Sequence, residues 1–193
     1  MTGPDPLAHG WWLASRASGL VALGLLTVAV LAGLVLGGRL DARPGAARAF
    51  RVLHEQAAVA GLIAVGAHGA TLLGDAWLRP GLAGVLVPGA IGYRPLPVAA
   101  GIVAGYLAAA LGLSHPLRRR IGIRRWRAAH RLTIVAYGLA IAHTITAGTD
   151  AAVGWVRWPT LAGAAAAGVL LVWRIVASRR RAVVAPGRVA AQR

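Results

Sequence analysis

The chain has 193 residues, 58% of them hydrophobic, with a mean hydropathy of +0.65, a composition typical of a membrane protein rather than a soluble domain. The absence of cysteine excludes disulfides, iron–sulfur clusters and thiolate metal sites. The net charge is +16, from 21 basic against five acidic residues. The basic residues flank apolar segments, a distribution that the positive-inside rule explains for a membrane protein and that argues against nucleic-acid binding.

Five apolar segments of about helix length follow one another along the chain. They cover residues 11–36, 52–73, 95–113, 128–147 and 158–177. Each has about the 20 residues that a helix needs to cross a bilayer. We therefore expect an all-α fold, a polytopic membrane helix bundle with about five transmembrane helices. Residues 1–10 would form an external tail, residues 11–178 the membrane domain, and residues 179–193 a cytoplasmic basic tail.

Arginine marks every second connection between these segments. Four arginines lie in residues 39–51, six in 118–127 and four in 174–181, whereas the other connections hold few. Arginine-rich loops stay on the cytoplasmic side. The sequence thus predicts a multi-pass protein of a bacterial inner membrane, with its N-terminus outside and its C-terminus in the cytoplasm. The long external connection 74–94 is expected either to cover the outer end of a site or to lie on the membrane surface.

Two of the apolar segments carry a histidine near each end. His54 and His68 lie in the second segment, and His130 and His143 lie in the fourth. The first two are 14 residues apart, which is about 21 Å along a helix and about 40° short of whole turns. The other two are 13 apart, about 20 Å, but about 140° out of phase, so that segment needs a local distortion. Histidine inside a membrane helix is costly and usually functional, although one alone is often a packing residue or part of a proton path.

Paired histidines at two depths favour haem over other metal cofactors. Haem iron takes two axial imidazoles, and helix bundles commonly hold cofactors between facing helices. Zinc or copper usually needs three or four donors, and neither depth offers a third in these segments. We therefore predict two b haems, about 20 Å apart along the membrane normal. Small residues would make room for them or serve close helix packing instead: Gly61, Gly66, Gly69 and Gly138.

Three arginines are candidates for binding the anionic haem propionates. Arg51 and Arg127 each precede a histidine by three residues, one turn toward the cytoplasm, and would serve the inner haem unless they are ordinary positive-inside anchors. Arg16 lies inside the first apolar segment, where it would serve the outer haem or extend to the interface. Tyr137 falls between the two histidines of its segment and is expected to be a core aromatic rather than a group between the haems.

The sequence resembles the ferric reductase-like transmembrane domain family, which includes NADPH oxidases, ferric reductases and the haem subunit of the methionine sulfoxide reductase system. The resemblance rests on the spacings of 14 and 13, on R-W-R-A-A-H-R-L…A-H at residues 125–143, and on S-R-A-S-G-L-V-A-L at residues 15–23. It covers residues 11–178. It implies that His54 pairs with His130 on the inner haem and His68 with His143 on the outer haem.

Two departures from the family pattern bear on the electron donor. Members often have six spans where we expect five, and many continue into a flavin and nicotinamide domain, for which this sequence has no G-x-G-x-x-G motif after a strand. We therefore expect an oxidoreductase subunit whose electrons come from a separate flavoprotein, carrying FMN or FAD, or from membrane quinol. The external acceptor would be ferric iron, oxygen or a partner protein.

Two other functions fit the same residues. One is a quinol-linked cytochrome b anchor subunit of a larger respiratory complex, which would share the haems but also need a quinone site. The other is a small membrane protein without haem that uses its histidines to handle protons or metal ions. His9 and His115 fall outside the paired arrangement and are expected to be solvated.

Overall fold

The structure, a computed structural model, describes residues 9–38, 40 and 45–184. Most of the predicted tail 1–10, part of the loop 39–51 and residues 185–193 of the predicted cytoplasmic tail therefore lie outside the described residues. Within the described part every regular element is helical, which confirms the all-α prediction. Residues 179–184 continue the last helix rather than forming a separate tail.

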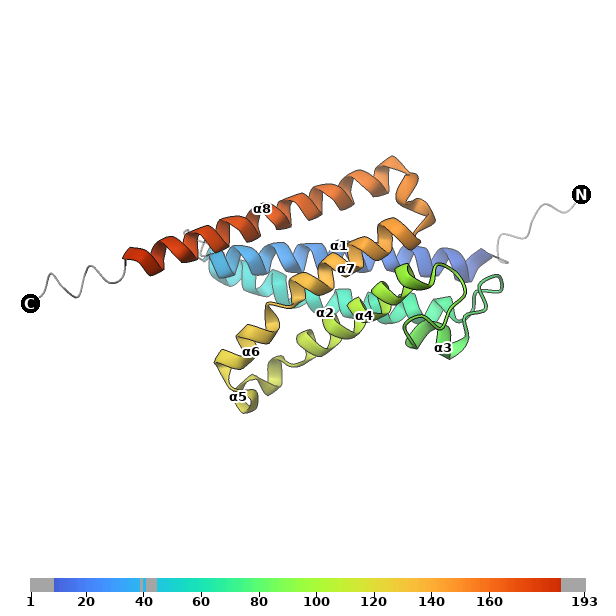
Figure 1. Cartoon of the computed structure of the whole chain (residues 1–193), viewed down its shortest axis with the longest axis horizontal. Coiled ribbons are helices and arrows are strands. Elements are labelled where there is room, and N and C mark those ends of the chain that lie inside the picture. The colour runs from blue at the N-terminus through green and yellow to red at the C-terminus, as the bar shows by residue number, and fades with distance from the viewer. Residues whose placement is uncertain (1–8, 39, 41–44, 185–193) are drawn as a thin grey trace, which may run out of the picture.

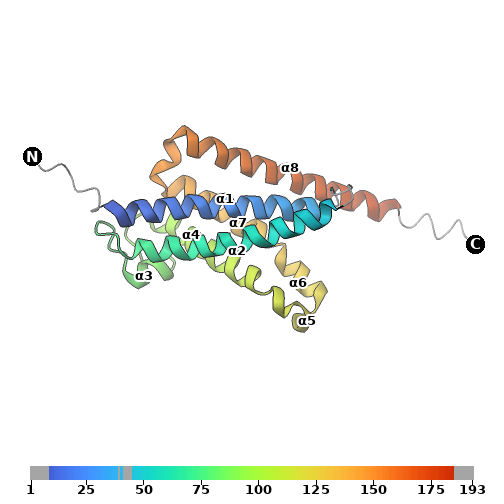
Figure 2. The same ribbon diagram turned by 180° about the vertical axis from the view of Figure 1, so that it is seen from behind.

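Five long helices form an elongated bundle (Figures 1 and 2). They are α1 (Gly10–Gly38), α2 (Ala46–Leu72), α4 (Pro95–Leu113), α7 (Thr133–Ala147) and α8 (Gly154–Val184). The most extensive packing joins α1 to α2 and α4 to α7, and α8 lies against α1 on the outside of the bundle. Shorter elements make the connections: α3 (Gly81–Leu86), α5 (Arg118–Ile121) and α6 (Ile123–His130), with the 3₁₀ turns η2 (His115–Leu117) and η3 (Thr149–Ala152).

Three helices are long and apolar enough to cross a membrane: α1, α4 and residues Gly154–Arg180 of α8. The predicted count of about five is therefore not confirmed. The helix α2 is long enough, but arginines, Glu55 and two histidines lower its apolar character. The helix α7 has 15 residues, about 22 Å of length, which falls short of a bilayer core of about 30 Å.

The outer surfaces of these helices are apolar. Ile63 of α2 and Val169 of α8 are 69% and 68% exposed, and no large side chain in the described part is fully buried. Contiguous exposed apolar surface on this scale marks a contact with another apolar phase. A bilayer around the bundle therefore accounts for these side chains better than water does.

The predicted fourth span, residues 128–147, is divided in two by a turn at Arg131 and Leu132. The N–H groups of Arg131, Leu132, Ile134 and Val135 each bond to the carbonyl three residues back, as in a 3₁₀-helix. Each such residue advances about 120° instead of 100°, so four of them recover about 80° of the 140° mismatch between His130 and His143. The change of direction between α6 and α7 (Figure 1) also turns one ring relative to the other.

The arginines of the connections gather at one end of the bundle. This arginine-rich end contains α5, α6, the start of α2 and the last part of α8 (Figure 1). Gly122, with a φ of 91°, separates α5 from α6 and lets the chain reverse there. The opposite end holds the connections between α2 and α4 and between α7 and α8, with few arginines.

Candidate functional site

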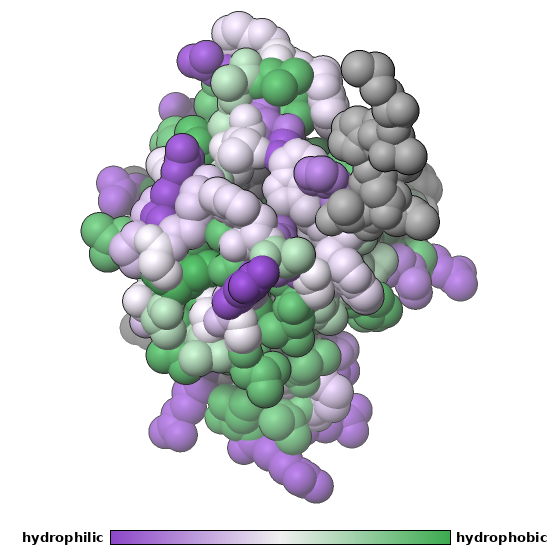
Figure 3. Space-filling view, turned by 90° about the vertical axis from the view of Figure 1, so that its right-hand side faces the viewer, coloured by the Kyte–Doolittle hydropathy of each residue, from purple (hydrophilic) through white to green (hydrophobic). Residues whose placement is uncertain are grey.

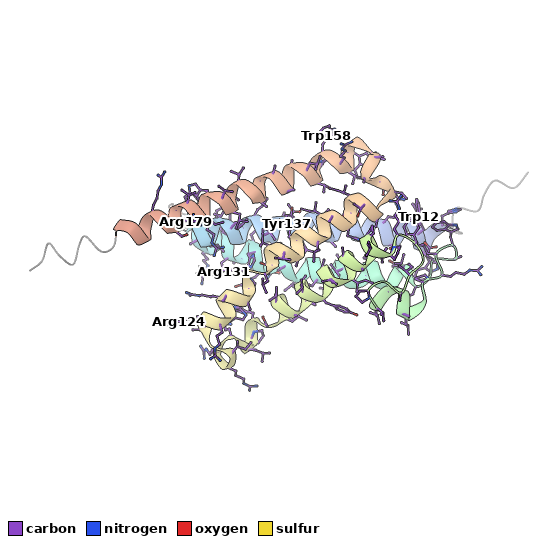
Figure 4. All side chains as sticks on the ribbon, viewed as in Figure 1. Trp12, Arg124, Arg131, Tyr137, Trp158 and Arg179 are labelled. Atoms are coloured by element: carbon purple, nitrogen blue, oxygen red, sulfur yellow. The ribbon has the colours of Figure 1, made fainter. Side chains whose placement is uncertain are left out.

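The four histidines of the second and fourth segments meet as two pairs. The ring centres of His54 and His130 are 6.1 Å apart, and those of His68 and His143 are 6.3 Å apart. His130 is the last residue of α6, next to Arg131, which Figure 4 labels, whereas His68 contacts Ser15, three residues from Trp12, which the figure labels toward the other end of the bundle. The structure thus brings together the same partners that the family resemblance implied.

The separation within each pair suits a metal ion held between two imidazoles. An imidazole nitrogen binds a metal ion at about 2.0–2.1 Å and lies about 1.1 Å from its own ring centre, so two imidazoles on opposite sides of one ion have ring centres about 6.3 Å apart. Aromatic rings in direct edge-to-face contact also have centres about 4.5–7 Å apart. The distance alone therefore does not distinguish a metal ion held between two imidazoles from direct contact between the rings. The hydrogen bonds of the other ring nitrogens therefore bear on the choice between metal binding and direct ring contact.

Three of the four histidines direct Nδ1 at a backbone carbonyl. Nδ1 lies 2.7 Å from the Ala29 oxygen in His54, 2.7 Å from the Ser15 oxygen in His68, and 2.9 Å from the Pro97 oxygen in His143. A carbonyl can only accept, so Nδ1 carries the proton in all three rings and Nε2 has a free lone pair. Metal-binding histidines are held in the same way, with the second nitrogen donating to a carbonyl.

Glycines on the neighbouring helices leave room for these rings. A Cβ atom on Gly19 would lie 3.0 Å from Nδ1 of His68, one on Gly33 would lie 3.1 Å from Cε1 of His54, and one on Gly101 would lie 2.6 Å from Nδ1 of His143. All three glycines therefore permit the hydrogen bonds from Nδ1 to the carbonyls. Gly61, one of the four glycines predicted either to make room for a cofactor or to allow close helix packing, packs against Leu26 of α1. It therefore serves close helix packing.

His130 is held differently from the other three. Its Nδ1 is buried and has no hydrogen-bond partner among the described residues. Instead, Trp126 stacks on the ring with centres 4.8 Å apart and an angle of 21° between planes. The indole N–H of Trp126 donates to Ser114 Oγ at 3.0 Å, which fixes the indole against the end of α4. His115 is exposed, as predicted, but its ring also contacts Trp126 at 5.6 Å.

A cavity of 2490 Å³ connects the two pairs. This volume far exceeds the roughly 300–1,000 Å³ of an ordinary small-molecule site, so the cavity has room for a cofactor at each level. Most of its wall is apolar, from all five long helices. The predicted site residues that line it are His54, His68, His130, His143, Arg16, Arg51 and Arg127.

The three predicted arginines differ in their surroundings. Arg51 and Arg127 are exposed at the arginine-rich end and form no hydrogen bond or ion pair with any described residue. Arg16 is ion-paired with Asp150, and its guanidinium lies 4.0 Å from the ring centre of Trp12. Arg16 therefore has a protein partner already, so pairing with Asp150 gives it a structural role besides the predicted one.

Tyr137 belongs to the packed core, as predicted. It is 5% exposed and clusters with Leu23 and Leu34 of α1 and Ala167 of α8. Its hydroxyl lies 3.0 Å from Thr27 Oγ1, so the buried polar atom is satisfied. In Figure 4 it sits midway along the bundle, between the levels of the two histidine pairs.

The connection 74–94 between α2 and α4 contributes both to the cavity and to the surface. Leu82, Val85 and Leu86 of α3 line the cavity, so α3 covers part of it at the end near His68 and His143. Leu82 is nevertheless 67% exposed. Figure 3 looks at this end of the bundle and shows hydrophobic residues gathered in the lower half of the face, where α3 lies. The segment thus covers part of the cavity and also exposes apolar side chains, and the two roles expected for it stay predictions.

Among the described residues no three His, Cys, Asp or Glu side chains form a metal-binding group. Two imidazoles are all that the protein must supply to a haem iron, whereas a bare ion would need more donors. We compared the chain with protein-family models, curated proteins and solved structures. None matches. The resemblance to the ferric reductase-like family therefore stays a prediction from the residues quoted above.

Sequence reasoning missed the residues that hold the histidines in place. These are Ser15, whose carbonyl accepts from His68, the glycines at 19, 33 and 101, and Trp126. A signal for two of them was present. Gly19 and Gly33 are 14 residues apart, the same spacing as His54 and His68, as expected where two antiparallel helices pack with glycine opposite histidine. Trp126 stands in the R-W-R-A-A-H motif quoted for the resemblance, which gave it no role of its own, and nothing in the local sequence distinguishes Gly101.

Proposed function

We propose that this chain is a transmembrane b-type di-haem electron-transfer protein, an oxidoreductase subunit of ferric reductase-like type. The observation that carries the proposal is the pairing of four imidazoles at 6.1 and 6.3 Å, three of them with Nδ1 held by a carbonyl. Two such pairs at separate levels of one large apolar cavity fit two haem b groups. Haem iron supplies reversible one-electron chemistry.

The protein would supply ligands, electrostatics and insulation. His54 and His130 bind the iron of the inner haem, and His68 and His143 bind that of the outer haem. Arg51 and Arg127 lie at the arginine-rich end, one turn from the inner ligands, where their guanidinium groups can pair with propionates. Arg16 has donors beyond those used by Asp150 and Thr149 and would do the same for the outer haem.

The direction of transfer follows from the arginine-rich end. By the positive-inside rule that end faces the cytoplasm of a bacterial cell, so the chain starts outside and ends inside. A cytoplasmic flavoprotein or membrane quinol would then reduce the inner haem, and an external acceptor would oxidise the outer one. The apolar residues along the cavity, including Tyr137, would provide a low-dielectric surrounding between the two levels.

An absorption spectrum of the purified protein tests the proposal. We expect a Soret band, a sharp alpha band on reduction, and two haems per chain by the pyridine haemochrome assay. Each of His54→Ala and His130→Ala should remove the same haem, and each of His68→Ala and His143→Ala the other. His9→Ala, an exposed histidine outside the cavity, is the control and should keep both. A folded wild-type protein without haem would refute the proposal and favour a proton- or metal-handling protein.

A further inference from the structure

Arg174 of α8 lies near the level of His54 and His130 and has no polar partner among the described residues. A Cβ atom on Gly37 of α1 would lie 2.8 Å from both Cζ and Nη1 of Arg174, so the guanidinium rests on the backbone of α1. Gly37 is one helical turn beyond Gly33, which makes room for His54, and one turn is about 6 Å along the axis. The guanidinium therefore lies about one turn from the His54 ring, on its arginine-rich side.

The setting of Arg174 is not that of an ordinary interfacial arginine. Arg174 lines the cavity and is half-buried, whereas Arg51 and Arg127 are exposed. It forms no hydrogen bond or ion pair with any of the residues that the structure describes. A guanidinium partly removed from water needs an anion or several acceptors, and the cavity that Arg174 lines has room for a group that provides them.

We infer that Arg174 binds a carboxylate of the ligand held between His54 and His130. The inference rests on the proposed function, since the carboxylate is then a propionate of the inner haem. The planar guanidinium makes two parallel hydrogen bonds to such a group, and Gly37 permits the approach because it has no side chain. Arg174 approaches from α8, whereas Arg51 belongs to α2 and Arg127 to α6, so the three guanidinium groups reach the cofactor from three different helices.

The test measures the inner haem alone, in a His68→Ala background that lacks the outer one. Arg174→Ala should lower the midpoint potential of the remaining haem, because loss of a nearby positive charge favours ferric iron. A tenfold change in the equilibrium corresponds to about 59 mV for a one-electron couple. The variant should also lose haem faster during purification. Arg174→Lys should keep part of the effect, and Gly37→Ala, which displaces the guanidinium but keeps its charge, should cause a smaller shift in the same direction.

Arg179→Ala is the matched control, since Arg179 carries the same charge near the free end of α8 (Figure 4) and does not line the cavity. An unchanged potential and haem content in Arg174→Ala, while His54→Ala still removes one haem, would overturn the Arg174 assignment and leave the proposed function standing. Equal shifts from Arg174→Ala and Arg179→Ala would also overturn it. Absence of haem from the wild-type protein would overturn both.

Discussion

Substitution of Gly101 tests the histidine geometry without touching a histidine. A Cβ atom at this position would lie 2.6 Å from Nδ1 of His143, against at least 3.4 Å for an ordinary contact. The imidazole in Gly101→Ala must therefore move by about 0.8 Å, several times the roughly 0.2 Å tolerance of a metal–ligand distance. The movement also breaks the 2.9 Å hydrogen bond to the Pro97 carbonyl. Loss of such an outer contact costs about 10- to 100-fold in metal affinity, or about 1.4–2.7 kcal/mol.

The other glycines provide a graded series. A Cβ on Gly19 or Gly33 would meet its histidine at 3.0 or 3.1 Å, so each ring needs to move by only about 0.3–0.4 Å. We expect Gly19→Ala and Gly33→Ala to keep both haems with a weakened affinity at the outer and inner sites, respectively. Gly24 of α1 has nothing within 4 Å of a new Cβ, so Gly24→Ala is the control.

The assay is the haem content per chain together with the reduced alpha band, measured in the same detergent for the whole series. Gly101→Ala should resemble His143→Ala, with the outer haem lost or easily removed and the inner haem intact. Retention of both haems with wild-type affinity in Gly101→Ala would refute the reasoning. So would loss of haem in Gly24→Ala, because helix packing alone would then explain the effects.

Three further predictions concern the supporting residues. Trp126→Ala should weaken inner-haem binding about two- to tenfold, since an aromatic stack is worth about 0.5–1.5 kcal/mol, whereas Trp126→Phe should restore it; equal haem retention in the two variants would contradict this. Tyr137→Phe should lower the free energy of unfolding by about 0.5–1.5 kcal/mol through the lost contact with Thr27, with unchanged haem content, as denaturant titration can measure. Asp150→Ala should change stability by less than about 1 kcal/mol because the pair with Arg16 is partly exposed, and loss of the outer haem would show that this ion pair organises the site.

The all-helical fold was predictable because the apolar segments are uninterrupted and flanked by arginine. The number of spans was not, since hydropathy runs continuously through residues 128–147 while the backbone breaks at Arg131 and Leu132. No glycine or proline marks that break. The one sign of the break in the sequence was the phase mismatch between His130 and His143. These two rings can face the same partner helix only if the helix between them is distorted.

The site was predictable at the level of its ligand candidates and not at the level of their support. Histidine spacing on α2 is enough to place two imidazoles on one face at two depths. Their Nδ1 acceptors are backbone carbonyls of Ser15, Ala29 and Pro97, and any residue type supplies a carbonyl, so sequence carries no trace of them. The partner of Arg16 was likewise hidden, since Asp150 lies 134 positions away and becomes adjacent only when η3 packs beside α1.

The turn between α6 and α7 means that His130 and His143 belong to separate rigid pieces of backbone. His54 and His68, in contrast, share one unbroken helix. A partner that pushes on the basic surface of α5 and α6 would tilt His130 against a stationary His54, while His68 and His143 keep their alignment. The separation between His54 and His130 can therefore change on its own, and a molecule that contacts the arginine-rich end would alter that pair while leaving His68 and His143 unchanged.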